Sequence, residues 1–195
     1  MPRLCRQTRE HLTSVMRSEI RAAFVRLIAE RRDEQGVTME DVAAELGIAK
    51  GTLYLYYRTK DELVLDAWQT EQNARFEKIR RKLRPDIPAP EQLECCVAIM
   101  MEDFLHSRWL RLEFFRNNPF PAPNRPNRLV QLFSEILRKG IREGSFRNVA
   151  AEDTALFIRN SLIGQFRYLL QTGEPLDVEK SMTVFRDMVI RALRP

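Results

Sequence analysis

The side chains best suited to chemistry lie between residues 38 and 60, where polar groups recur in a short segment. Lys50, Thr52, Tyr54 and Tyr56 alternate with glycine and leucine, so one stretch offers an ammonium group and three hydroxyl groups. Phosphate oxygens and the edges of DNA bases accept hydrogen bonds from such groups. The pattern therefore indicates a surface that could face the major groove of DNA.

Two short helices joined by a tight turn would position this surface. Thr38, with Asp41 three residues later, predicts a capping box at the start of the first helix, with Asp in place of the usual Glu or Gln. Gly47 can adopt the positive φ that closes a helix, and Ala43 is small enough for a second helix to approach closely. An apolar set would lock the two helices together: Leu46, Ile48 and Leu53. The spacing alone fits a helix-turn-helix or an ordinary αα-hairpin.

Residue types for catalysis or metal binding are sparse. His11 and His106 are far apart, and neither has an obvious nucleophile beside it. The three cysteines (Cys5, Cys95 and Cys96) form no CxxC pair, and the chain has no glycine-rich phosphate loop and no HExxH pattern. We therefore expect no enzyme, no cofactor and no metal site. A helical adaptor whose basic end binds an acidic protein or a lipid is the remaining alternative.

The composition predicts an all-α chain. It has 44% hydrophobic and 30% charged residues, which is enough apolar material for a core. Seven of the ten prolines fall in two clusters that should separate helices: Pro85, Pro88 and Pro90, then Pro119, Pro121, Pro123 and Pro126. The helices expected are one that ends before Gly36, then 60–83, 91 to about 117 as one or two helices, 127–143, 151–171 and 178–193. Without a membrane-length apolar run or a secretory signal, the expected location is the cytoplasm.

Several motifs between residues 18 and 65 now combine into a family pattern. They are Ile20-Arg-Ala-Ala-Phe, Gly36, Thr38-Met-Glu-Asp-Val-Ala, Leu46-Gly-Ile-Ala-Lys-Gly-Thr-Leu-Tyr-Leu-Tyr-Tyr and Thr59-Lys-Asp-Glu-Leu63. This segment resembles the N-terminal domain of the TetR (tetracycline-repressor) family of transcriptional regulators. The resemblance implies about nine helices, with a helix-turn-helix DNA-binding domain at 1–63 and a ligand-binding and dimerisation domain at 64–195. A fourth helix, at about 60–83, would connect them.

The resemblance also implies which residues contact DNA. They are Thr38, Lys50, Gly51, Thr52, Tyr54, Leu55, Tyr56 and Lys60. Thr38 would hold a phosphate, Lys60 would clamp the DNA backbone, and Leu55 would touch a thymine methyl group. Lys50, Gly51 and Thr52 would face the bases from the start of the second helix. Tyr54 and Tyr56 of the same helix would reach phosphates or base edges. Tyr57 stands where the family usually has a buried Phe, so we expect it in the core with its hydroxyl near the rim.

The C-terminal part of the chain is rich in aromatic residues and methionine. Six of these are candidates to line a pocket between helices: Met100, Phe104, Trp109, Phe115, Phe133 and Phe157. Such a lining would suit an apolar or aromatic small-molecule effector. Taken singly, each of these residues is more often part of an ordinary core than a ligand contact.

The last two expected helices carry apolar faces suited to a dimer. The candidates are Phe157, Ser161, Leu162, Gly164, Phe166, Phe185, Met188 and Val189. The resemblance implies a two-fold four-helix interface there, whereas an intramolecular core is the alternative for the same residues. It also implies a homodimeric repressor released from a pseudo-palindromic DNA operator by a small molecule.

The net charge of +5 is concentrated near the N-terminus. Residues 1–84 contain 17 Lys and Arg against 13 Asp and Glu, and the rest of the chain is almost neutral. Five arginines make the N-terminal arm basic: Arg3, Arg6, Arg9, Arg17 and Arg21. That arm is either a solvated tail or a segment that follows the DNA backbone or enters the minor groove.

Overall fold

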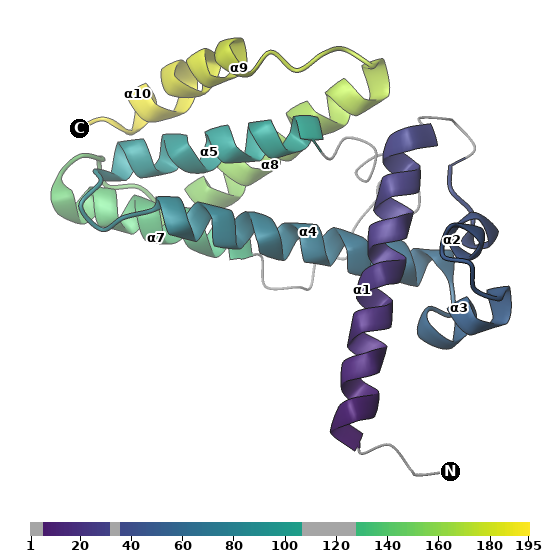
Figure 1. Cartoon of the computed structure of the whole chain (residues 1–195). Helices are drawn as coiled ribbons and strands as arrows, with labels where there is room; N and C mark the ends of the chain where they lie inside the picture. Colours follow the sequence, from purple (N-terminus) through teal and green to yellow (C-terminus); the bar gives the residue numbers. More distant parts are fainter. Residues whose placement is uncertain (1–5, 32–35, 107–127) are drawn as a thin grey trace. The chain divides into compact units, whose positions relative to one another are not determined.

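A computed structural model of the chain describes residues 6–31, 36–106 and 128–195, and every regular element in these ranges is helical. The elements are α1 (Arg6–Arg31), α2 (Met39–Glu45), α3 (Lys50–Tyr56), α4 (Lys60–Lys82), α5 (Ala89–His106), α7 (Arg128–Glu143), α8 (Ala151–Thr172), α9 (Val178–Phe185), a π-helical turn η1 (Arg186–Ile190) and α10 (Arg191–Leu193) (Figure 1). The all-α prediction is confirmed. The part of the expected 91–117 stretch beyond His106 lies outside the described residues.

The described residues fall into two compact units. The head unit comprises 6–31 and 36–72, and the body unit comprises 73–106 and 128–195. The boundary falls within α4, whose first turns belong to the head and whose last turns belong to the body. None of the helices described is both long enough and apolar enough to cross a membrane.

Helix α1 extends into the N-terminal arm, which is helical from Arg6 onward. It is continuous from Arg6 to Arg31, because no glycine or proline interrupts that stretch, and its first turns extend past α2 and α3 (Figure 1). Residues 8–15 are exposed, whereas Ile20, Phe24 and Leu27 are buried. The 3–4 spacing of these apolar residues gives α1 one face that packs and an N-terminal segment that does not.

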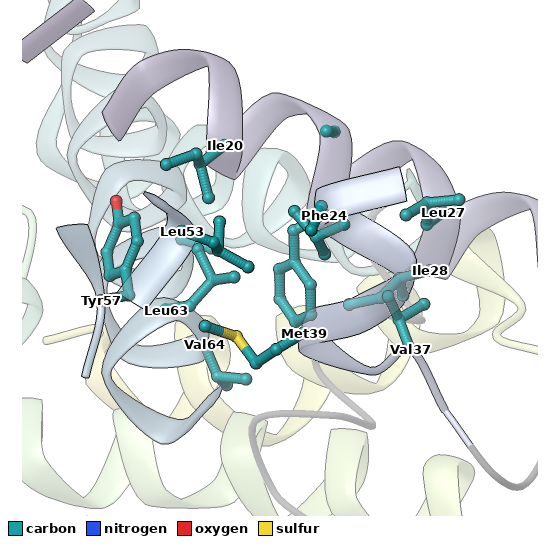
Figure 2. Packing of buried hydrophobic residues seen from close by; sticks show 14 residues of the cluster. Ile20, Phe24, Leu27, Ile28, Val37, Met39, Leu53, Tyr57, Leu63 and Val64 are labelled. Carbon is teal, nitrogen blue, oxygen red and sulfur yellow. The ribbon is translucent and has the colours of Figure 1, made fainter. Parts of the chain in front are cut away.

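The core of the head unit is built by four helices. Phe24 of α1, Val42 of α2, Leu53 of α3 and Leu63 of α4 are each fully buried and belong to one apolar cluster (Figure 2). Burial of a large apolar side chain stabilises a fold by about 1.5–3 kcal/mol. The two short helices, which are only seven residues each, therefore depend on this packing for their stability.

The body unit packs α7 against α5 and α8, with α9 against α5. Phe104 of α5 and Phe166 of α8 stack with their ring centroids 4.3 Å apart, and both are buried. Gly140 of α7 is needed where the turn after the helix packs back, because a Cβ atom there would clash with the Phe146 ring. The N–H of Phe146 donates to the carbonyl of Gly140, which holds the ring against the helix.

The last helix differs from its prediction in one respect. Asp177 caps its start as expected, with its carboxylate accepting from the N–H of Lys180 at 2.9 Å. A single helix over 178–193 was expected, but residues 186–190 form a π-helical turn in which the N–H of Arg191 bonds the carbonyl of Arg186. Side-chain periodicity does not distinguish such a wide turn from α-helix over five residues.

Candidate nucleic-acid interface

The capping box at the start of α2 is confirmed. The Thr38 hydroxyl donates to Oδ2 of Asp41 at 2.6 Å, the Thr38 N–H donates to the same oxygen at 2.8 Å, and the Asp41 N–H returns a bond to Thr38 Oγ1. Arg31 at the end of α1 pairs with the same carboxylate at 2.8 Å. The hydrogen bonds from Thr38, followed by Arg31, lower the pKa of Asp41 from 3.8 to about 2. Both donors of Thr38 are therefore engaged within the protein.

The turn between α2 and α3 has the conformation expected of a helix-turn-helix. Gly47 has a φ of +63°, and a Cβ atom there would meet nothing within 4 Å, so backbone conformation rather than space favours glycine. The N–H of Ile48 donates to the carbonyl of Ala43 at 3.0 Å, and that of Gly47 to Ala44 at 3.1 Å. The predicted turn is confirmed.

Helix α3 separates its residues into an anchoring face and an outward face. Leu53, and Tyr57 directly after the helix, are fully buried in the head core. The predicted DNA contacts from this helix are exposed or half-buried: Lys50, Gly51, Tyr54 and Leu55 are exposed, and Thr52 and Tyr56 are half-buried. Leu55 is 83% exposed, so its side chain is open to contact with a partner.

The exposed end of α3 carries an ion pair that the sequence analysis did not find. The ammonium group of Lys50 pairs with the Glu40 carboxylate of α2 and lies 5.8 Å from the centre of the Tyr54 ring. The hydrogen bond from Lys50 lowers the pKa of Glu40, and the same bond raises the pKa of Lys50. A carboxylate ten residues before a lysine gives no helical spacing signal, because the turn at Gly47 brings the two together.

The start of α4 is fixed by a second capping arrangement. The N–H of Glu62 donates to Oγ1 of Thr59 at 3.1 Å, and the Glu62 carboxylate accepts the N–H of Arg58 at 2.9 Å. Lys60, the first residue of α4 and a predicted DNA contact, is half-buried. The segment that leads from α3 into α4 is thus held by its own side chains.

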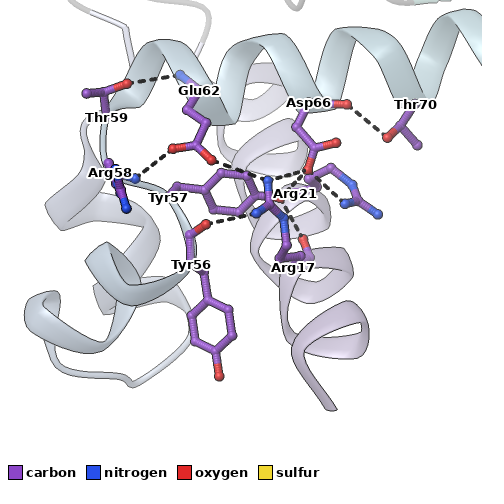
Figure 3. A network of polar contacts seen from close by, with 9 residues as sticks. All are labelled: Arg17, Arg21, Tyr56, Tyr57, Arg58, Thr59, Glu62, Asp66 and Thr70. Atoms are coloured by element: carbon purple, nitrogen blue, oxygen red, sulfur yellow. Dashed lines mark hydrogen bonds and ion pairs between the residues drawn. The ribbon is translucent and has the colours of Figure 1, made fainter. Parts of the chain in front are cut away.

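A polar network joins three helices at the end of α3 (Figure 3). Oδ2 of Asp66 accepts hydrogen bonds from the Tyr57 hydroxyl at 2.5 Å and from Arg21 at 3.0 Å. Arg17 lies 3.5 Å from the same oxygen, donates to the Tyr56 carbonyl at 3.2 Å, and stacks over the Tyr57 ring at 4.3 Å. Tyr57 thus occupies the core with its hydroxyl at the edge, as predicted.

This network corrects the interpretation of two arginines. Arg17 and Arg21 are two of the five arginines of the expected basic arm, but both guanidinium groups are paired with Asp66 within the head unit. They lie on the same face of α1 as Ile20 and Phe24, at helical spacings of three and four. That shared face is the signal that places them toward the core, although it does not identify Asp66 as their partner.

The network holds its groups in defined protonation states. Burial raises the pKa of Tyr57 to about 12, and the hydrogen bond to Asp66 acts in the same direction, so the hydroxyl keeps its proton. Burial opposes the charged form of Asp66, but the hydrogen bonds from Tyr57 and Arg21 and the two nearby arginines together lower its pKa. At neutral pH the network is therefore a neutral tyrosine, two cations and a carboxylate, with Glu62 as a second carboxylate 3.5 Å from Arg17.

The predicted pocket residues divide between the core, the surface and the segment that is not described. Met100, Phe104 and Phe133 are buried in the body unit, and Phe157 is 68% exposed. Trp109 and Phe115 lie outside the described residues. Burial is compatible with a core role and with a pocket wall, so these assignments stay predictions.

The predicted dimer residues also divide. Leu162, Phe166 and Phe185 are buried within the body unit, whereas Phe157, Ser161, Gly164 and Met188 are exposed and Val189 is half-buried. Three further apolar residues of α8 and α9, which the sequence analysis did not name as dimer residues, are exposed as well: Leu156, Tyr168 and Val184. The dimer assignment likewise stays a prediction.

Comparison with known proteins agrees with this geometry. A family model described as bacterial regulatory proteins of the tetR family matches residues 20–67, which span the C-terminal part of α1, all of α2 and α3, and the first turns of α4. No sequence among the curated proteins matches the chain.

Solved structures share the fold over almost the whole chain. A TetR-family transcriptional regulator from Pectobacterium atrosepticum superposes with a TM-score of 0.78 at 16% identity, covering 97% of both chains. A putative transcriptional regulator from Saccharomonospora viridis, in complex with choline, gives 0.72 at 21% identity over 90% of this chain and 97% of that one. A tetR-family regulatory protein from Rhodococcus gives 0.69 at 21%, over 91% and 96%. Residues 20–67 therefore match the tetR family of bacterial regulatory proteins, and the chain as a whole shares its fold with solved structures described as regulators of that family.

Proposed function

We propose that the protein is a homodimeric transcriptional repressor, acting in the cytoplasm, that binds a pseudo-palindromic operator and leaves it when a small molecule binds. The observation that carries this proposal is the division of α3, with Leu53 anchored in the core and Lys50, Tyr54 and Leu55 exposed beside it. A short helix buried on one side and rich in donors on the other fits the major groove of B-DNA.

Each exposed group on α3 has a plausible counterpart on DNA. The Lys50 ammonium suits guanine O6 and N7 or a phosphate, and the Tyr54 hydroxyl suits a phosphate or a base edge. The Leu55 side chain, 83% exposed, suits the methyl group of thymine. Lys60, just beyond α3, suits the phosphate backbone, so base reading and backbone clamping come from adjacent elements.

The exposed apolar residues of α8, α9 and η1 support a dimer. Phe157 is 68% exposed and Met188 is 72% exposed, and a second copy that covered them would remove both from water. A two-fold dimer would present two recognition helices to half-sites about 34–36 Å apart. This is why the expected operator is pseudo-palindromic.

The proposed class of effector follows from the side chains inside the body unit. Met100, Phe104 and Phe133 give the body unit an apolar and aromatic interior, so an apolar or aromatic small molecule is the expected class. A putative transcriptional regulator with the same fold is described in complex with choline, which supports a small-molecule effector for this chain. Release would follow if the effector favours a conformation that spaces the recognition helices wrongly for DNA.

Selection of bound fragments from genomic DNA with the purified full chain tests the proposal. The expected result is an enriched inverted repeat, bound far more tightly than a scrambled duplex of the same length. Absence of any enriched repeat would contradict the proposal, and binding that depends steeply on salt without sequence preference would indicate the adaptor alternative.

A pair of matched variants sharpens that test. Tyr54→Phe removes one exposed hydroxyl from α3 and should weaken operator binding by about tenfold, the effect of a lost hydrogen bond. Tyr168→Phe removes an exposed hydroxyl from α8 and should leave operator binding unchanged. Equal effects of the two substitutions, measured by fluorescence anisotropy, would argue against α3 as the reading helix.

A further inference from the structure

A seven-residue helix cannot hold its own orientation, so the groups at the end of α3 determine where it points. Within the helix only Leu53 is buried, and it fixes one point near the middle. The Tyr57 ring is buried directly after the helix and Tyr56 packs against the same apolar cluster, so these side chains resist removal of α3 from the core. Apolar contacts are not directional, so they define the angle of so short a helix less sharply than hydrogen bonds do. A second fixed point is needed at the C-terminal end.

Asp66 of α4 supplies this second point. Its Oδ2 atom accepts the Tyr57 hydroxyl at 2.5 Å, Arg21 at 3.0 Å and Arg17 at 3.5 Å (Figure 3). The side chain of Asp66 is 25% exposed, and Arg21 is 21% exposed, so these charge-assisted bonds are partly shielded from water. One oxygen atom thus ties the residue that ends α3 to α1 and to α4.

Arg17 extends the same tie to the backbone of α3. Its Nη1 donates to the carbonyl of Tyr56 at 3.2 Å, and its guanidinium group stacks on the Tyr57 ring at 4.3 Å. Carbonyl groups in the last turn of a helix lack intrahelical partners, so this bond satisfies one of them. The last turn of α3 is therefore held through the backbone and through a side chain.

We propose that Asp66 is a positioning residue for DNA recognition, which sets the angle of α3 by fixing Tyr57 and Arg17 and thereby sets the preference for the operator over other DNA. The proposal rests on the proposed function. Asp66 itself need not touch DNA, because it acts through the hydroxyl of Tyr57 and through Arg17. Loss of the hydrogen bonds to Asp66 would leave α3 packed through Leu53 and the Tyr57 ring, but with its angle less sharply defined.

The change in charge in an Asp66 variant distinguishes a positioning role from a general electrostatic effect on DNA binding. Asp66→Asn removes one negative charge from the head unit and leaves Arg17 and Arg21 with one carboxylate fewer, which by itself should tighten binding to any DNA. A positioning role predicts that operator binding weakens while binding to a scrambled duplex does not. The two effects have opposite signs for the operator.

The experiment compares the affinity of the full chain for its selected operator and for a scrambled duplex at several salt concentrations. Asp66→Asn and Tyr57→Phe should each lower the ratio of the two affinities by about tenfold, and the double variant should lower it little further, because both remove the same tie. Asp61→Asn is the matched control. It removes the same charge from an exposed position of α4 and should leave the ratio unchanged.

The measured affinity ratios test the positioning role of Asp66 and the proposed function separately. A ratio that stays at the wild-type value in both Asp66→Asn and Tyr57→Phe, or that falls equally in Asp61→Asn, would overturn the positioning role while leaving the proposed function intact. A wild-type chain with no operator preference would overturn both. If Asp66→Asn unfolds the head, as judged by circular dichroism, the Tyr57→Phe ratio decides, since that substitution removes only a hydroxyl group.

Discussion

Asp41 shows how much of the local structure depends on one ionised side chain. Its carboxylate accepts both donors of Thr38 at the start of α2 and pairs with Arg31 at the end of α1. It therefore closes a helix terminus and joins two helices of the head at once. The sequence pattern identified the capping box, because Thr38 and Asp41 are three residues apart. The same pattern could not predict the ion pair between Arg31 and Asp41, because that contact depends on the packing of α1 against α2.

The depressed pKa of Asp41, about 2 compared with an ordinary 3.8, predicts acid sensitivity of the head. A carboxyl group with a lower pKa in the folded state adds stability above pH 3.8, and that stability is lost as the pH falls toward 2. Asp41→Asn should therefore lower the free energy of unfolding by about 1 kcal/mol at pH 7 and flatten its decline between pH 4 and pH 2. Urea titrations followed by circular dichroism at each pH measure both effects.

Asp153→Asn is the control for this prediction. Asp153 is exposed in the first turn of α8, where Ala150 at the N-cap makes no side-chain hydrogen bond. Its replacement removes the same charge from a helix start that has no capping box. A decline between pH 4 and pH 2 that is as steep in Asp41→Asn as in Asp153→Asn would contradict the role given to Asp41.

At the scale of elements, turn and cap residues predicted more of the structure than composition did. Thr38, Gly47 and Asp177 each perform the local role that their residue type favours, and these roles locate α2, the turn and α9. The network around Asp66 was not predictable in the same way. Arg17 and Asp66 are 49 residues apart, and a charged residue on a helix is ordinarily assigned to solvent until the helices around it are placed.

The N-terminal extension of α1 gives a prediction at this scale. Residues 8–15 are helical but exposed, so deletion of residues 1–12 should leave thermal unfolding almost unchanged. The deleted segment carries Arg3, Arg6 and Arg9 against Glu10. If it follows the DNA backbone, affinity for the operator and for a scrambled duplex should fall by a similar factor. The plot of log affinity against log salt should also become flatter by about one to two units.

A variant that changes only charge shows whether the deletion acts through loss of the helical segment or through loss of its positive charge. Arg6→Gln combined with Arg9→Gln keeps the length of α1 and removes two positive charges. It should reproduce most of the loss if contact with phosphates is the cause. Unchanged affinity and salt slope after the deletion would show that the extension does not follow DNA.

At the scale of the whole molecule, the body unit contains side chains that a single copy leaves in water. Phe157, Val184 and Met188 are all more than half exposed, although all three are apolar. The sequence marked α8 and α9 as apolar but could not separate the residues that pack inward from those that face out. Phe166 and Phe157 illustrate this limit, since only the position of α5 makes the first of them a core residue.

Dimerisation gives the prediction at this scale. Phe157→Glu combined with Met188→Glu places charges on the exposed apolar surface without altering the body core. Because each substitution occurs twice in a two-fold dimer, the dimer should dissociate at roughly hundredfold higher concentration. Size-exclusion chromatography with light scattering measures this. Leu105→Glu, on an exposed apolar residue of α5, is the control that should remain dimeric, and a wild-type chain that is monomeric at micromolar concentration would refute the interface.

The pairing of Lys50 with Glu40 has a consequence for how the protein meets DNA. Before Lys50 can bond a phosphate it must exchange its carboxylate partner, so part of its positive charge is already neutralised by a counterion that belongs to the protein. A lysine of this kind releases fewer salt ions on binding than one solvated by the buffer. The salt dependence of operator binding will therefore understate the number of phosphates that the head contacts, because one of the exchanged ions is a side chain.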